Sequence, residues 1–132
     1  MQKTIVARTG LSLLLLGAGV LHFLDPEPFV KMVPSALPDP DLLVALSGFF
    51  EIVGSVGLIS PRASLRRAAA FGTIALFIAV FPANVNMAVN GLGLGDLPPN
   101  QVANWLRLPL QALLIYWAWR VAKSAAVPNL PR

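Results

Sequence analysis

The sequence predicts an all-α protein, an integral membrane four-helix bundle that forms a single domain over residues 1–132. Hydrophobic residues make up 56% of the chain and charged residues 12%, whereas soluble domains carry about 25% charged residues. Four apolar runs of about 18–22 residues are each long enough to cross the hydrocarbon core as a helix. Basic and acidic residues also alternate between the segments that separate these runs, as expected when a chain crosses a bilayer repeatedly.

The first helix is predicted over residues 6–24. Lys3 and Arg8 precede its apolar run, as they would in a secretory signal. The following residues, 20–26 (VLHFLDP), offer no pair of small residues at which a signal peptidase would cut. We therefore expect a retained membrane helix.

The connection that follows is rich in proline. Pro26 and Pro28 can start a turn of helix, and Pro34 stops it. This pattern predicts a short interfacial helix over residues 26–34 whose apolar side would cover the mouth of the bundle like a lid. The alternative is an ordinary proline-stiffened connection.

The second helix is predicted over residues 42–59. Within it, Ser47 and Glu51 are one turn apart and lie on the same face. Small residues continue this stripe, and small residues allow helices to approach closely in membranes.

The third helix is predicted over residues 68–89 and the fourth over residues 105–122. Pro82 removes the backbone donor for the Ile78 carbonyl, which predicts a kink and a free acceptor in the third helix. Asn100 and Asn104 are both candidate caps for the fourth helix.

The charge pattern predicts the topology. Basic residues precede the first helix, separate the second from the third, and close the chain, while acidic residues dominate the first loop. The positive-inside rule then places both termini in the cytoplasm. The net charge of +4 is explained by these anchors, so we expect the lipid bilayer as a partner and no nucleic acid.

Composition limits the chemistry. The chain has no cysteine and one histidine, which excludes thiol relays, iron–sulfur ligation, covalent haem attachment and a bis-histidine haem. We expect no metal site and no covalent cofactor. A redox role would need a partner protein or a small molecule such as a quinone.

Glu51 is the candidate catalytic residue, because a charged group inside a membrane helix costs about 2.5–3.5 kcal/mol and usually faces a protein interior or a wet cavity. Further polar residues fall at similar depth on the outer side, and Arg107 is the cation nearest in depth. The alternatives are a protonated, purely structural Glu51, an Arg107 that extends to the headgroups, and asparagines that only join helices. The candidate ligand-binding residues are His22, Ser47, Asn84, Asn86, Arg107 and Gln111.

Five segments resemble small bacterial membrane proteins of the DoxX family. They are residues 17–23 (GAGVLHF), 29–34 (FVKMVP), 47–54 (SGFFEIVG), 81–88 (FPANVNMA) and 106–111 (LRLPLQ). The resemblance implies a four-helix protein of the bacterial inner membrane that crosses it several times. It also implies a relation to a subunit of a thiosulfate:quinone oxidoreductase.

Three functions remain open at this point. The first is an accessory or quinone-facing subunit of a membrane redox complex, with other membrane or peripheral redox subunits as partners. The second is a protein that binds a lipid or another small hydrophobic ligand, or an isomerase-like enzyme that uses Glu51 to move a proton. The third is a structural assembly factor. Whether the chain is an enzyme is left open.

Overall fold

The computed structural model describes residues 1–93 and 96–125, and every regular element within them is an α-helix. The predicted all-α class is therefore confirmed for this part of the chain. The helices are α1 (Gln2–Leu24), α2 (Glu27–Met32), α3 (Pro40–Leu58), α4 (Ala63–Val89) and α5 (Gln101–Ala125).

Helices α1, α3 and α4 are long and apolar enough to cross a membrane, whereas α5, although 25 residues long, does not meet the same criterion. Between 17% and 28% of the residues in the apolar windows of α1, α3 and α4 are buried inside the protein. Soluble monomers rarely expose apolar surface on this scale. The exposed side chains therefore suit contact with lipid.

Each long helix begins before its predicted apolar run, and in α3 and α5 a capping side chain marks the start. Helix α3 starts at Pro40, and the Asp39 side chain accepts a hydrogen bond from the Leu42 amide at 3.3 Å. Helix α5 starts at Gln101. Its cap is Asn100, whose side chain accepts a hydrogen bond from the Ala103 amide at 3.1 Å.

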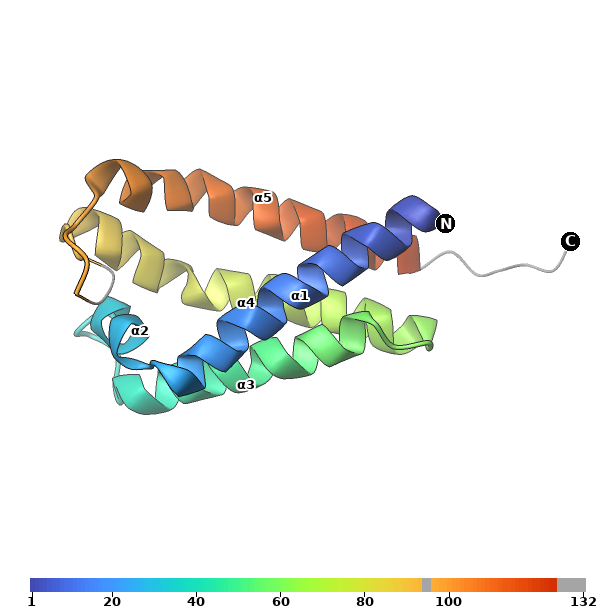
Figure 1. Cartoon of the computed structure of the whole chain (residues 1–132), viewed down its shortest axis with the longest axis horizontal. Coiled ribbons are helices and arrows are strands. Elements are labelled where there is room, and N and C mark those ends of the chain that lie inside the picture. The colour runs from blue at the N-terminus through green and yellow to red at the C-terminus, as the bar shows by residue number, and fades with distance from the viewer. Residues whose placement is uncertain (94–95, 126–132) are drawn as a thin grey trace, which may run out of the picture.

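The long helices form two closely packed pairs, α1 with α3 and α4 with α5, which are joined by contacts between α3 and α4 (Figure 1). Helix α1 meets α5 near the N-terminus and diverges from it toward the other end of the molecule. The short helix α2 lies at that diverging end and contacts α3 and α4. The interior is therefore closed at one end and roofed by α2 at the other.

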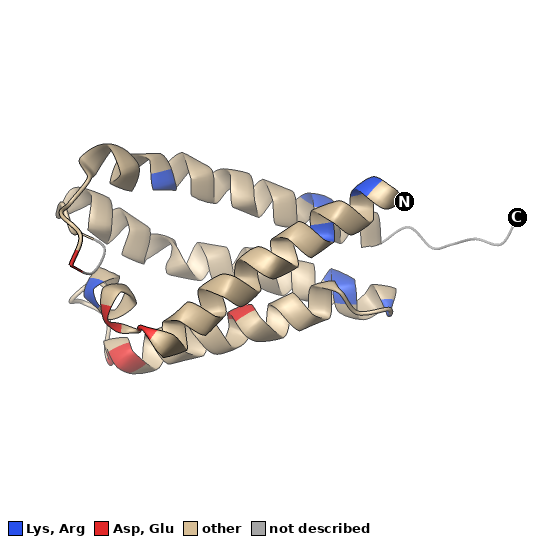
Figure 2. Cartoon of the chain, viewed as in Figure 1, with Lys and Arg blue, Asp and Glu red and all other residues tan. Residues whose placement is uncertain are grey.

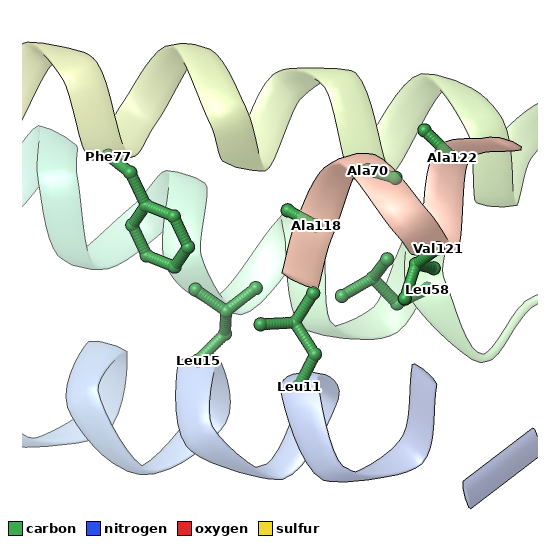
Figure 3. Packing of buried hydrophobic residues seen from close by; sticks show 8 residues of the cluster. All are labelled: Leu11, Leu15, Leu58, Ala70, Phe77, Ala118, Val121 and Ala122. Atoms are coloured by element: carbon green, nitrogen blue, oxygen red, sulfur yellow. The ribbon is translucent and has the colours of Figure 1, made fainter. Parts of the chain in front are cut away.

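An apolar core fills the closed end (Figure 3). Leu11 and Leu15 of α1 meet Leu58 of α3 there, together with small residues of α4 and α5 such as Ala70 and Ala118. These five side chains are almost completely buried. The small alanines let the helices approach closely, so this end is densely packed.

The α1–α3 contact depends on two glycines. A Cβ atom added at Gly19 would lie 2.8 Å from the Gly48 carbonyl oxygen, and one added at Gly48 would lie 2.7 Å from the His22 Cβ. Further along the same contact, the Ser12 hydroxyl donates to the Ser55 carbonyl at 2.8 Å. The two backbones are therefore in direct contact where His22 begins to face α3.

Charges separate toward the two ends of the molecule (Figure 2). Lys and Arg gather mainly at the end that carries the N-terminus, and Asp and Glu at the end that carries α2. Lys31, in α2, and Arg107, near the start of α5, are cations at the acidic end. Glu51 lies between the two ends, partway along α3.

Candidate functional site

Glu51 and His22 face each other across the α1–α3 contact. Glu51 follows Gly48 of α3 by three residues, and His22 follows Gly19 of α1 by three residues. Both side chains therefore lie about one helical turn from the point where the two helices approach most closely. The His22 Nδ1 atom lies 3.1 Å from the Glu51 Oε2 atom. Sequence reasoning favoured Arg107 as the nearest cation, but the structure places His22 beside Glu51.

The two side chains do not form a simple hydrogen bond. His22 Nδ1 also lies 2.6 Å from the Ala18 carbonyl oxygen. Because a carbonyl can only accept, Nδ1 must carry a proton directed at that oxygen, which assigns the tautomer by inference. Glu51 Oε2 is therefore close to His22 but receives no well-directed donor, and it is closed off from solvent.

The Glu51 side chain also lines a cavity. Glu51 is only 7% exposed and lines a cavity of about 360 Å³. Its Oε2 atom is enclosed, so contact between the carboxyl group and the cavity falls to Oε1. A cavity of this volume lies within the range of small-molecule sites, about 300–1,000 Å³.

The cavity lies between the diverging helices and is lined mostly by apolar side chains. Leu15, Phe77 and Leu114 lie on its side toward the apolar core, and Phe29 and Met32 of α2 lie on the opposite side. Its polar lining residues come from four of the helices. They are His22, Ser47, Glu51, Asn84 and Gln111.

Phe29 forms part of the roof and was not predicted as a site residue. Its ring stacks on the His22 imidazole with the ring centroids 3.9 Å apart and the planes 19° apart. The apolar pattern of residues 29–33 signalled a covering helix, but nothing in the sequence linked Phe29 to His22. The roof is thus in direct contact with the histidine beside Glu51.

An amide pair forms part of the cavity wall on α4 and α5. The Gln111 side chain donates to the Phe77 carbonyl at 2.7 Å, and the Asn84 side chain donates to the Gln111 side-chain oxygen at 3.0 Å. Pro82 was expected to offer the Ile78 carbonyl as the free acceptor. Gln111 instead donates to the carbonyl of the preceding residue, Phe77, whose side chain is buried, whereas the Ile78 side chain is exposed.

Asn86 and Arg107 lie outside the cavity lining. The Asn86 side chain donates to the Met32 carbonyl at 2.9 Å and so holds the end of α2 against α4. Arg107 Nη1 lies 2.9 Å from the Met87 sulfur in the α4–α5 contact. Arg107 is one helical turn before Gln111 and contacts the end of α4, whereas Gln111 reaches the cavity.

Asn104 has a structural role that the sequence did not reveal beyond a candidate cap. It is 2% exposed. Its side chain donates to the Met87 carbonyl at 3.2 Å and to the Leu92 carbonyl at 3.0 Å. Asn104 therefore closes the connection between α4 and α5 by donating to one carbonyl in the last turn of α4 and to one in the segment that follows it.

Fold and site together define a helical protein with three possible membrane spans and an apolar cavity that holds one buried acid. Residues 11–122 match the family model for a domain of unknown function, DUF8561. The chain belongs to that family. No curated protein and no solved structure matches the chain.

This family assignment corrects the resemblance to DoxX proteins, which is wrong. Glycine pairs, Pro-x-Asn segments and apolar runs recur in small helical membrane proteins because they permit close packing and polar contacts between helices, so they do not distinguish one family from another. The expected bacterial inner membrane and the expected link to a thiosulfate:quinone oxidoreductase rested on that resemblance. Neither has support from the family that matches.

Proposed function

We propose that this chain is a membrane-embedded protein that binds a small, largely apolar molecule through one polar group. The observation that carries the proposal is the cavity of about 360 Å³ that Glu51 lines together with mostly apolar side chains. Small-molecule sites combine these same features, a mainly apolar wall and a few placed polar groups.

A purely structural role explains Glu51 less well. A buried polar group that only supports packing is normally satisfied by its neighbours. Glu51 Oε2 has no well-directed donor among the described residues, and the proton of His22 Nδ1 is directed at Ala18. An acid inside a membrane helix costs about 2.5–3.5 kcal/mol, and a bound ligand that contacts the carboxyl group would offset part of this cost.

In this proposal α5 is the fourth membrane span. At 1.5 Å per residue a helix of this length covers about 38 Å, enough to cross the hydrocarbon core, and α5 packs along α4. The basic end with the N-terminus faces the cytoplasm, and the acidic end with α2 faces the opposite side.

Cysteine labelling tests this topology. A cysteine at Ser35, in the exposed segment after α2, should react with an impermeant thiol reagent added from outside the cell. A cysteine at Ser64, at the exposed start of α4, should react only after permeabilisation. The reverse labelling pattern would contradict the proposed orientation.

The binding function is tested by filling the cavity. Ala83 lines the cavity, and Ala75, on the same helix, is exposed outside the lining. Native mass spectrometry of protein released from nanodiscs should detect a co-purified small molecule in the unmodified protein and in Ala75→Phe. The same molecule should be lost from Ala83→Phe. Absence of any bound molecule from the unmodified protein, or equal retention by both variants, would contradict the proposed function.

A further inference from the structure

Among the described residues, the cavity lining includes an acidic side chain but no Lys or Arg to balance it. Glu51 is the single acid in the lining, and no Lys or Arg of the described residues lines it. The cation of α2 is Lys31, which is exposed and pairs with Glu27 at 2.9 Å. Helices α4 and α5 contribute neutral amide side chains to the cavity lining, and α1 contributes His22.

The lining keeps free donors as well as free acceptors. The buried Ser47 hydroxyl has no hydrogen-bond partner among the described residues, and the Asn84 and Gln111 amide nitrogens each keep a second N–H. Of the two Glu51 carboxyl oxygens, Oε1 is the one left to meet the cavity, because Oε2 is enclosed. With its Nδ1 proton directed at the Ala18 carbonyl, a neutral His22 keeps a lone pair on Nε2. The Asn84 amide nitrogen donates to Gln111, and its oxygen accepts no hydrogen bond from another described residue. The charge therefore decides the ligand class more sharply than the hydrogen bonds do: a group that meets the Glu51 carboxylate must donate to it, and a positive charge on that group would balance an acid for which the described residues of the lining offer no Lys or Arg.

From this arrangement we infer that the ligand is a hydrophobic amine bound as a cation, with its ammonium group paired to the Glu51 carboxylate. The inference rests on the proposed binding function and specifies its ligand class. A quinone head group offers only acceptors and would require a protonated Glu51. An amine satisfies both the charge and the lone pairs.

Two further features favour an organic cation. Asp25, between α1 and α2, and Asp39 and Asp41, at the start of α3, outnumber the cations Lys31 and Arg107 at the end of the molecule that α2 covers, and a net negative charge raises the local concentration of cations. Among the described residues no group of three His, Cys, Asp or Glu side chains that could hold a metal ion is present at the cavity. Its apolar wall instead suits a hydrocarbon body.

The inference also predicts competition with protons. The carboxylate that pairs with the ammonium group is the same group that a proton would neutralise, and the lining holds no second acid. His22 is the other titratable group that faces Glu51, and a protonated His22 would repel a cation. Both effects make amine binding weaker at lower pH.

Three probes of the same shape and different charge test the inference: adamantan-1-amine, which is protonated at neutral pH, adamantan-1-ol and adamantane-1-carboxylate. Binding to the nanodisc-reconstituted protein is measured by equilibrium dialysis, with empty nanodiscs as the control for partition into lipid. We expect the amine to bind at least tenfold more tightly than the alcohol, and the carboxylate to bind least.

Variants show which acidic residue is responsible for the preference for the amine over the alcohol. Glu51→Gln should bind amine and alcohol equally, and retained alcohol binding would show that its cavity is intact. Glu51→Asp should keep a preference for the amine. Glu27→Gln removes an exposed acid at the same end of the molecule and should leave the preference unchanged.

The outcomes separate the two proposals. Equal binding of amine and alcohol by the unmodified protein would overturn the inference and leave the binding function standing. A preference for the amine that persists in Glu51→Gln would also overturn it, because the charge would then lie elsewhere. Failure of all three probes to bind the unmodified protein would count against both proposals.

Discussion

Replacing Gly48 with alanine would disturb the contact that holds His22 beside Glu51. The added Cβ atom would lie 2.7 Å from the His22 Cβ and 3.1 Å from the Gly19 carbonyl oxygen. Carbon atoms in van der Waals contact lie about 3.5–4.0 Å apart, so α1 and α3 would have to separate locally by about 1 Å. Overpacking of this kind costs about 1–3 kcal/mol.

Gly17→Ala is the matched control, because a Cβ atom at Gly17 would meet nothing within 4 Å. Alanine is favoured over glycine in a helix by about 0.5–1 kcal/mol, so this variant should be as stable as the unmodified protein or slightly more stable. Thermal unfolding in detergent should give Gly48→Ala a lower Tm than Gly17→Ala. The free energies of unfolding should differ by about 1–3 kcal/mol.

Imidazole NMR signals provide a local measurement, because His22 is the one histidine of the chain. They should shift in Gly48→Ala, as the imidazole moves away from the Glu51 carboxyl group, and remain in place in Gly17→Ala. Equal Tm values for the two variants together with unchanged His22 signals would refute the argument that this glycine contact positions the pair.

Two further predictions concern the roof. Asn86→Ala removes the donor to the Met32 carbonyl. Loss of this hydrogen bond, worth about 0.5–1.5 kcal/mol, should speed amide hydrogen exchange in α2 by about twofold to tenfold. The Asn90 side chain bonds only Asn86 among the described residues, so Asn90→Ala should change the exchange little, and equal effects of the two variants would contradict the role of Asn86 in holding α2. The hydrogen bond from Lys31 lowers the pKa of the exposed Glu27 carboxyl. The pair therefore stabilises α2 at pH values above the ordinary pKa of a glutamate, and this stabilisation is lost as the pH falls through the lowered pKa of Glu27. Lys31→Ala should raise the Glu27 pKa in an NMR titration, and an unchanged titration would show that the pair does not persist in solution.

The helical class was predictable because apolar run length and the scarcity of charge are properties of the sequence itself. The position of α2 was suggested by its prolines, since Pro26 precedes the first helical residue and Pro34 follows the last turn. The rotation of each helix about its axis was not predictable. Arg107 and Gln111 share a helix face by spacing, yet Gln111 reaches the cavity and Arg107 reaches Met87 of α4.

The partner of Glu51 illustrates the same limit. Sequence reasoning ranks neighbours by charge and depth, and by that measure Arg107 comes first. In the structure proximity is set by the Gly19–Gly48 contact, which brings α1 close enough for His22 to lie 3.1 Å from Glu51. Two small residues in different helices decide this geometry, and their pairing cannot be deduced from one sequence.

Phe77 connects the stability of the protein with the size of its cavity. Its side chain belongs to the apolar core and also lines the cavity, and it is 6% exposed. Its carbonyl accepts the hydrogen bond from Gln111, which in turn accepts one from Asn84. Packing at the closed end therefore fixes the position of this wall of amides on α4 and α5. Close-packed protein interiors do not deform freely. The roof helix α2 is held by the Asn86 hydrogen bond and by the stacking of Phe29 on His22. A ligand that needs more room should therefore displace α2 before it displaces this wall.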